Sequence, residues 1–334
     1  MSMIQLFISF CVFVLSAGEI QEITVPNDAW DGTHSVLCAT IKVAPDSYVY
    51  SFEPIRRPKT VRHISVAVCD AELDTTKIWD CKTPKEVCPN GISDALWAAA
   101  KDAPGWNLPK DYAFRIRKNY NYVVVQIHAP MNMTLNSTKS FSRMGVKLGI
   151  TTQRPKYVAA LALFGNVGFI PAHATDFTAD TACNWQYKDT PLFAFGIHSH
   201  TMATAITGYI YSNYSYTEIV RADPRYPEPI VNIEGRNIVL KNKDLLMMRC
   251  TLTNPTDQKA NFGYEHTDQM CNLNLWFGIP KEYENIYKPI VCGRNAQKFS
   301  LDDYGYILPK NSNKPDIEGY KKLMSQFNLT MTSY

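Results

Sequence analysis

Short apolar runs, rich in β-branched and aromatic residues and often alternating with polar ones, recur along this chain. Such runs predict β-strands, because successive side chains of a strand point to opposite faces of a sheet. They lie at residues 34–43, 48–55, 61–69, 120–129, 145–151, 157–165, 191–200, 207–212, 245–253 and 270–279. Pro, Asn, Asp or Gly separates most of them, and there is no βαβ rhythm. The pattern predicts an all-β protein of two antiparallel β-sandwich, jelly-roll-like domains.

Two segments favour helix instead. Residues 94–102 contain good helix formers after a plausible cap at Ser93, and one short helix is expected near residues 320–327. The polar, proline-containing stretch at residues 151–157 is the expected linker. It divides the chain into an N-terminal domain at residues 19–152 and a C-terminal domain at residues 153–303, followed by a loosely ordered polar tail at residues 304–334.

The N-terminus has the pattern of a secretory signal peptide. An apolar run from Ile4 to Leu15 precedes small residues and then Glu19, although a basic n-region is lacking. We assign residues 1–18 to the signal peptide. The run is too short to span a bilayer comfortably, and no later segment reaches roughly 18 uninterrupted apolar residues. We therefore expect a soluble, secreted protein, in the secretory pathway or a vesicle lumen.

Cysteines and sequons agree with secretion. Removal of the signal peptide takes Cys11 and leaves eight of the nine cysteines, an even number that predicts four disulfides. Counting alone allows 105 pairings. N-glycosylation sequons stand at Asn132, Asn136, Asn213 and Asn328.

Composition narrows the function classes. The chain has 334 residues, of which 46% are hydrophobic, so it is globular, and its net charge is only +3. The basic residues are scattered, which argues against nucleic acid or a polybasic membrane patch as partners.

Histidine pairs supply candidate chemistry. In the run at residues 191–200, His198 and His200 share one strand face, so both imidazoles aim at one point, as transition-metal ligands do. The alternative is two surface histidines near a strand end. Met270 has polar neighbours in a second alternating run. It either fills a packing gap or adds the thioether that suits copper cycling between Cu(I) and Cu(II).

Two further histidines lie in the first half. His63 opens one apolar strand and His128 closes another. Taken alone, each is better explained as a core histidine whose ring is hydrogen-bonded than as a metal ligand.

The motifs together resemble a known family. TVRHISVAVC, VVVQIHA, FGIHSHTMATAITGY and DQMCNL occur in the order and rough spacing of the peptidylglycine α-hydroxylating monooxygenases, which use copper and ascorbate. The match runs from about Cys38 to Cys292. This resemblance implies the activity, ligands, substrate contacts and disulfides that follow.

Two copper sites are implied. His198, His200 and Met270 would hold the oxygen-binding copper, which abstracts hydrogen from the substrate, and these are the catalytic residues. His63 and His128 would hold an electron-storage copper. Its third ligand in the family is a histidine where this sequence has Arg62. A guanidinium stays protonated and cannot bind copper, so this site is weakened.

The implied substrate is a glycine-extended peptide, with O₂ as co-substrate and ascorbate as reductant. Asn272 matches a substrate-binding asparagine, but an anchoring arginine is replaced by Gly196 and a tyrosine by Asn274. Arg249 or Arg143 could compensate, although the sequence places neither in the pocket. The implied disulfides are Cys38–Cys81, Cys69–Cys88, Cys183–Cys292 and Cys250–Cys271.

Three functions remain open. The first is hydroxylation of the glycine Cα, the first step of peptide C-terminal amidation, which a separate lyase would complete. The second is hydroxylation of another small substrate, favoured by Gly196 and Asn274. The third is a secreted copper or peptide binder without activity, favoured by Arg62.

Overall fold

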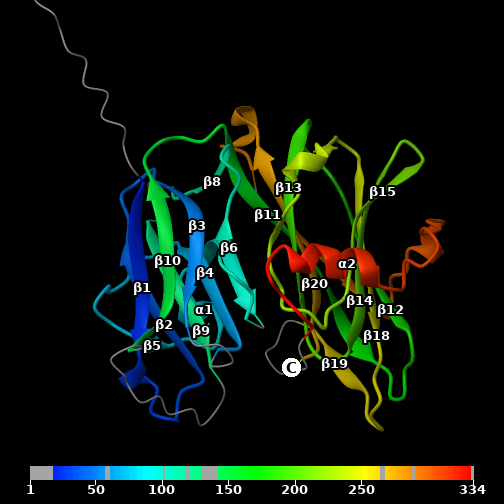
Figure 1. Ribbon diagram of the computed structural model, residues 1–334, viewed down its shortest axis with the longest axis horizontal. Coiled ribbons are helices and arrows are strands. Elements are labelled where there is room, and N and C mark those ends of the chain that lie inside the picture. The colour runs from blue at the N-terminus through cyan, green and yellow to red at the C-terminus, as the bar shows by residue number, and fades with distance from the viewer. Residues whose placement is uncertain are drawn as a thin grey trace, which may run out of the picture.

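Two β-sandwiches lie side by side in the computed structural model of the chain, the first coloured mainly blue to cyan with the green strand β10, and the second mainly green to red (Figure 1). The structure describes residues 18–331 except 57–60, 101, 118–120, 130–141, 264–267 and 288–289. Residues 1–17 of the expected signal peptide and the sequons at Asn132 and Asn136 therefore lie outside the described residues.

The first sandwich packs two sheets face to face. One sheet runs in the order β1 (Glu19–Pro26), β10 (Arg143–Thr151), β3 (Tyr48–Ile55) and β8 (Tyr112–Arg115), with β7 (Trp106–Asn107) beside β3. The other runs in the order β5 (Trp79–Asp80), β2 (Val36–Lys42), β9 (Tyr122–His128), β4 (His63–Cys69) and β6 (Ile92–Ala100). Alternate side chains such as Val66, Val125 and Val146 fill the core between them.

The second sandwich has the same plan. One sheet contains β11 (Tyr157–Ile170), β20 (Cys271–Ile279), β13 (Thr190–Ser199) and β16 (Val231–Asn232), with β17 (Val239–Leu240), β19 (Ala260–Phe262) and β21 (Ile290–Asn295) at its margins. The facing sheet runs β12 (Phe177–Asn184), β18 (Leu245–Leu252), β14 (Ala203–Ser212) and β15 (Ser215–Ala222). Phe164, Ile206 and Leu273 lie in the core between them.

A tight seam joins the two sandwiches. β8 pairs in parallel with β11, so one sheet of 12 strands continues from the first sandwich into the second. Beside this junction the ring of Trp106 lies 5.1 Å from that of Trp276, and the ring of Tyr112 lies 4.1 Å from that of Phe193. Buried aromatic area of this kind favours a fixed orientation of the two halves.

The predicted all-β class is confirmed, and a strand overlaps each of the ten predicted segments. The helix predicted at residues 94–102 is wrong, because this segment is strand β6, hydrogen-bonded along β4. Leu96 and Trp97 are buried in the first core, and Ser93 Oγ donates to the carbonyl of Val68 in place of capping a helix. Pairing and burial override the helix propensity of alanine here.

Four disulfides hold the strands, in the pairing that the resemblance implies: Cys38–Cys81, Cys69–Cys88, Cys183–Cys292 and Cys250–Cys271. The first two lie within the first sandwich and the last two within the second. Removal of a native disulfide typically costs about 2–5 kcal/mol, so each half carries its own covalent support.

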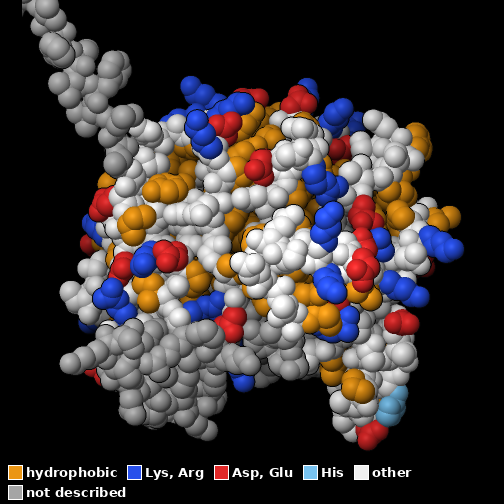
Figure 2. Space-filling model, viewed as in Figure 1, with side chains coloured by type: hydrophobic (Ala, Val, Ile, Leu, Met, Phe, Trp, Pro, Cys, Tyr) orange, Lys and Arg blue, Asp and Glu red, His pale blue; other side chains and the backbone are white. Residues whose placement is uncertain are grey.

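The C-terminal segment is packed, contrary to the expected loose order. Helix α2 (Ile317–Ser325) agrees with the short helix expected near residues 320–327, and its Tyr320 and Met324 are buried in the second core. The other helices are short: α1 (Pro84–Val87) and 3-10 turns at Asn27–Ala29, Glu234–Arg236, Lys281–Tyr283 and Asp302–Tyr304. No helix among the described residues is long and apolar enough to cross a membrane. Basic and acidic side chains are interspersed on the face in Figure 2.

Candidate metal centre

The two first-half histidines are direct neighbours on adjacent strands. His63 is the first residue of β4 and His128 the last of β9, and their Cα atoms are paired in the antiparallel register. Their ring centroids lie 5.4 Å apart. The fold thus brings together the two histidines that the resemblance assigns to one copper, although each taken alone looked like a core histidine.

The H-x-H pair lies at the end of β13. The rings of His198 and His200 are 5.4 Å apart and nearly perpendicular. The backbone N–H of His200 donates to the carbonyl of Met270 over 3.0 Å, which places the backbone of Met270, the residue before β20, beside the pair. Three candidate ligands of the second half therefore share one strand end.

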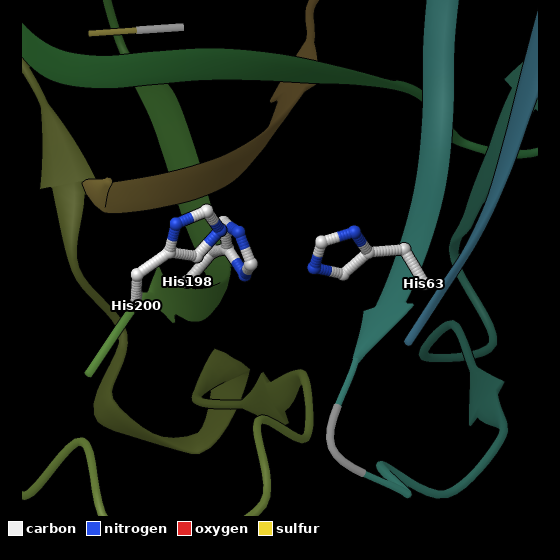
Figure 3. Close-up of side chains that lie close together, drawn as sticks. All are labelled: His63, His198 and His200. Atoms are coloured by element: carbon white, nitrogen blue, oxygen red, sulfur yellow. The ribbon is translucent and has the colours of Figure 1, made fainter. Parts of the chain in front are cut away.

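The histidines of the two halves converge, which the sequence did not indicate. The ring of His63 lies 4.8 Å from that of His198 and 6.2 Å from that of His200. Figure 3 shows His63 reaching from one side toward the other two rings. One ligating atom from each of these three side chains falls within 4.8 Å of the others. Imidazoles in this arrangement suit copper or zinc.

Hydrogen bonds orient both rings of the H-x-H pair. The Nδ1 of His198 lies 2.8 Å from the carboxylate of Glu228, and the Nδ1 of His200 lies 2.7 Å from the carbonyl oxygen of Asp268. A carbonyl oxygen or a carboxylate only accepts, so each Nδ1 carries the proton and each Nε2 carries the lone pair that a metal needs.

Glu228 is the main residue that sequence reasoning missed. It is 4% exposed and also accepts the backbone N–H of Ser199 over 2.9 Å. It lies in a proline-flanked stretch with no strand or motif pattern. Only its position next to His198 reveals a role.

Burial lowers the pKa of His63 well below its usual value, and the neighbouring His198 and His128 lower it further. Deprotonated imidazole is the form that binds metals. Arg62, which precedes it, is exposed, and its backbone N–H donates to the carbonyl of His128. The guanidinium adds no ligand to the pair.

The expected substrate contacts lie along the same strands. Asn272 is the Cα partner of His198, is 7% exposed, and donates from Nδ2 to the carbonyl of Phe164 over 3.2 Å. Asn274 is the Cα partner of Gly196. A Cβ atom at Gly196 would lie only 3.0 Å from Cζ3 of Trp276, so the indole occupies the space above this glycine.

Both arginines suggested as replacements for the anchoring arginine at position 196 already pair with an acidic residue. Arg249 is buried and makes two hydrogen bonds to Asp180, at 2.7 and 2.8 Å. Arg143 lies in the first sandwich and pairs with Glu22 at 2.5 Å. A cavity of about 120 Å³ between the sandwiches is lined by Asp94, Arg117 and Tyr287 among others, and none of the five candidate ligands lines it.

Fold and site together define a disulfide-stabilised, all-β protein with a histidine-rich centre where two sandwiches meet. Residues 157–303 match the family model described as the C-terminal domain of copper type II ascorbate-dependent monooxygenases. The second half of the chain, at residues 157–303, therefore belongs to this family of copper monooxygenases.

Curated relatives match over most of the chain. Peptidylglycine alpha-amidating monooxygenase of Rattus norvegicus is 25% identical over 288 residues, which are 85% of this chain and 28% of the relative. Peptidyl-glycine alpha-amidating monooxygenase A of Xenopus laevis is 24% identical over 81% of this chain and 29% of its own length. The chain thus spans less than a third of these relatives. A solved structure, the major capsid protein P2 of bacteriophage PM2, covers 78% of this chain and 97% of its own at 10% identity, with a TM-score of 0.37.

Proposed function

We propose that the protein is a secreted, copper- and ascorbate-dependent monooxygenase that hydroxylates the Cα of a C-terminal glycine in glycine-extended peptides. The observation that carries this is the gathering of His198, His200 and Met270 at one strand end, with His63 and His128 across the seam. Imidazole and thioether donors fit copper in both oxidation states. The proposal includes a separate lyase to complete amidation.

The chain's own residues would prepare the site. Glu228 and the Asp268 carbonyl hold Nδ1–H of His198 and His200, so that each ring presents Nε2. His198, His200 and Met270 would hold the oxygen-side copper, and His63 and His128 the second copper, weakened by Arg62. Bound copper supplies the one-electron chemistry for O₂. One oxygen atom would enter the Cα–H bond, and the other would leave as water, with two electrons from ascorbate and two protons.

A specific observation favours a second candidate, hydroxylation of another small substrate. Trp276 covers Gly196, where the resemblance places the arginine that anchors a peptide carboxylate. Loss of a buried charge pair of this kind costs about 2–5 kcal/mol of binding. A substrate without a carboxylate avoids that loss. The binder without activity remains the third candidate, on the strength of Arg62.

Turnover tests the proposal. The copper-loaded protein is incubated with ascorbate and a glycine-extended peptide, and mass spectrometry looks for the gain of one oxygen. The Met270→Ala variant should lose the product, whereas Met331→Ala, whose side chain is 44% exposed, should keep it. Equal product from Met270→Ala and the parent would refute the oxygen-side assignment. No product from the parent, with copper bound, favours another substrate or a binding role.

A further inference from the structure

The C-terminal helix α2 packs against the stretch that carries Glu228, the acid that orients His198. This helix, red in Figure 1, lies against the second sandwich and follows the segment at residues 157–303 that matches the family model. The ring of its Tyr320 contacts that of Tyr226, two residues before Glu228. We propose that Tyr320 is a positioning residue, which holds Glu228 against His198 by packing its ring on Tyr226. This goes beyond the proposed function, in which the chain after residue 303 has no part.

Hydrogen bonds fix the path of the chain that leads to α2. The buried carboxylate of Asp180, on β12, pairs with Arg249 and accepts the backbone N–H of Leu301 over 2.9 Å. Further along, Oγ1 of Thr207 on β14 donates to the carbonyl of Ser312 over 2.8 Å. Buried polar groups of this kind are costly to leave unpaired. The segment is therefore fastened to the sandwich on its way to the helix.

The start of α2 is fixed at the end of β15. Asp316 is the N-cap of the helix, and its side chain accepts the backbone N–H of Gly319 over 3.1 Å. The backbone N–H of Asp316 donates to the carbonyl of Arg221 over 3.0 Å. Tyr320 and Met324, four residues apart, lie on one face of the helix, and both are buried in the second core. The cap and this buried face together determine where Tyr320 lies.

The stretch that carries Glu228 depends on side-chain packing. Residues 223–230 connect β15 to β16 and form neither strand nor helix. Three of these eight residues are prolines, which have no backbone N–H to donate. Tyr226 is 3% exposed, and its ring meets that of Tyr320 at a centroid distance of 5.8 Å and an angle of 74°. Edge-to-face aromatic pairs are favourable, so loss of the Tyr320 ring would free this stretch on one side.

The charges near Tyr320 agree with this arrangement. Burial raises the pKa of Tyr320 most, and the carboxylates of Glu228 and Asp223 raise it further. The phenol therefore lies in the field of the acid that it supports. Its hydroxyl has no hydrogen-bond partner among the described residues, so the support comes from the ring and not from a hydrogen bond.

A displaced Glu228 would change the state of His198. The carboxylate lies 2.8 Å from Nδ1 of His198 and keeps the proton on this nitrogen. His200 has a separate partner, the carbonyl oxygen of Asp268. Loss of the Tyr320 ring should therefore release the tautomer of His198 and leave that of His200 as it is.

Nitrogen-15 NMR of the metal-free protein tests the inference, because it shows which ring nitrogen of each histidine carries the proton. The spectra are recorded at about pH 8.5, two units above the usual pKa of histidine. Copper, ascorbate and peptide are absent, so failure of the proposed function does not affect the result. His198 should carry its proton on Nδ1 in the parent. In Tyr320→Ala the Nε2–H tautomer should appear at His198, while His200 keeps the parent tautomer. In a separate titration, this variant should bind copper about 10-fold more weakly or worse.

Met324→Ala is the matched control, since Met324 is buried on the same face of α2. It should lower the melting temperature as Tyr320→Ala does, yet keep the parent tautomer at His198. Tyr320→Phe retains the ring and should behave as the parent. Tyr320→Leu replaces Tyr320→Ala if the latter melts before the measurement. The parent tautomer in Tyr320→Ala overturns the inference. A changed tautomer in Met324→Ala or in Tyr320→Phe overturns it too, because packing of the Tyr320 ring would then not be what holds Glu228.

Discussion

The carboxylate of Glu228 lies 2.8 Å from Nδ1 of His198, so a buried acid fixes which nitrogen of this ring carries the proton. The same carboxylate accepts the backbone N–H of Ser199, which ties it to the end of β13. The orientation of His198 therefore depends on a residue outside β13 and β20.

Glu228→Gln should weaken copper binding by about 10–100-fold, because the amide removes the negative charge that supports His198. Competition titration of the metal-free protein measures the change. Glu218→Gln is the control, since Glu218 is a surface acid paired with Arg221, and it should bind copper as the parent does. Parent-like affinity in Glu228→Gln would show that Glu228 serves only to hold the backbone.

Arg62→His should increase the copper bound per chain. The added imidazole would lie next to the His63–His128 pair and supply the ligand that a guanidinium cannot. Metal analysis after dialysis counts the ions, and Arg62→Ala controls for loss of the positive charge alone. If Arg62→His and Arg62→Ala bind the same amount, the missing histidine does not limit occupancy.

Gly196→Ala should destabilise the fold by about 1–3 kcal/mol, as overpacking does in a filled core. The new Cβ would lie 3.0 Å from Cζ3 of Trp276, which is 3% exposed and packed against Trp106. Urea unfolding measures the change. Gly235→Ala is the matched control, because nothing lies within 4 Å of its added Cβ. A variant as stable as the parent would mean that Trp276 can yield, and that a longer side chain fits at position 196.

Asp94→Asn should stabilise the protein at neutral pH. Burial raises the pKa of Asp94 to about 6 from 3.8, although Arg117 opposes the shift. A carboxyl whose pKa is raised by folding costs nothing below about pH 4, and its cost grows until the pH passes about 6. The variant should therefore match the parent at pH 4 and exceed it by about 3 kcal/mol at pH 7.

Unfolding curves at pH 4 and pH 7 measure this difference. The exposed Asp303 provides the control variant, Asp303→Asn. An equal gain at both pH values would assign the effect to packing of the amide and not to titration of the carboxyl.

The local hydrophobic pattern was sufficient to predict the strands with clear alternation. The H-x-H at residues 198–200 could be placed on one strand face because the period of a strand is two residues. The disulfide pairing followed from the resemblance, since counting cysteines left it open. The prediction for the segment that forms β6 was wrong, because its alanines favour helix. Pairing with β4 and burial of Trp97 decide its conformation instead.

By itself, the sequence determined the all-β class and the family, and it supplied the candidate histidines and methionine. Only the tertiary structure decided that His63 lies beside His198, that Glu228 orients His198, and that Trp276 covers Gly196. These relationships join segments far apart in the chain. The first depends on how the two sandwiches pack at the seam, and the other two depend on contacts within the second sandwich. Side-chain periodicity within one strand carries no information about which distant segments pack against it.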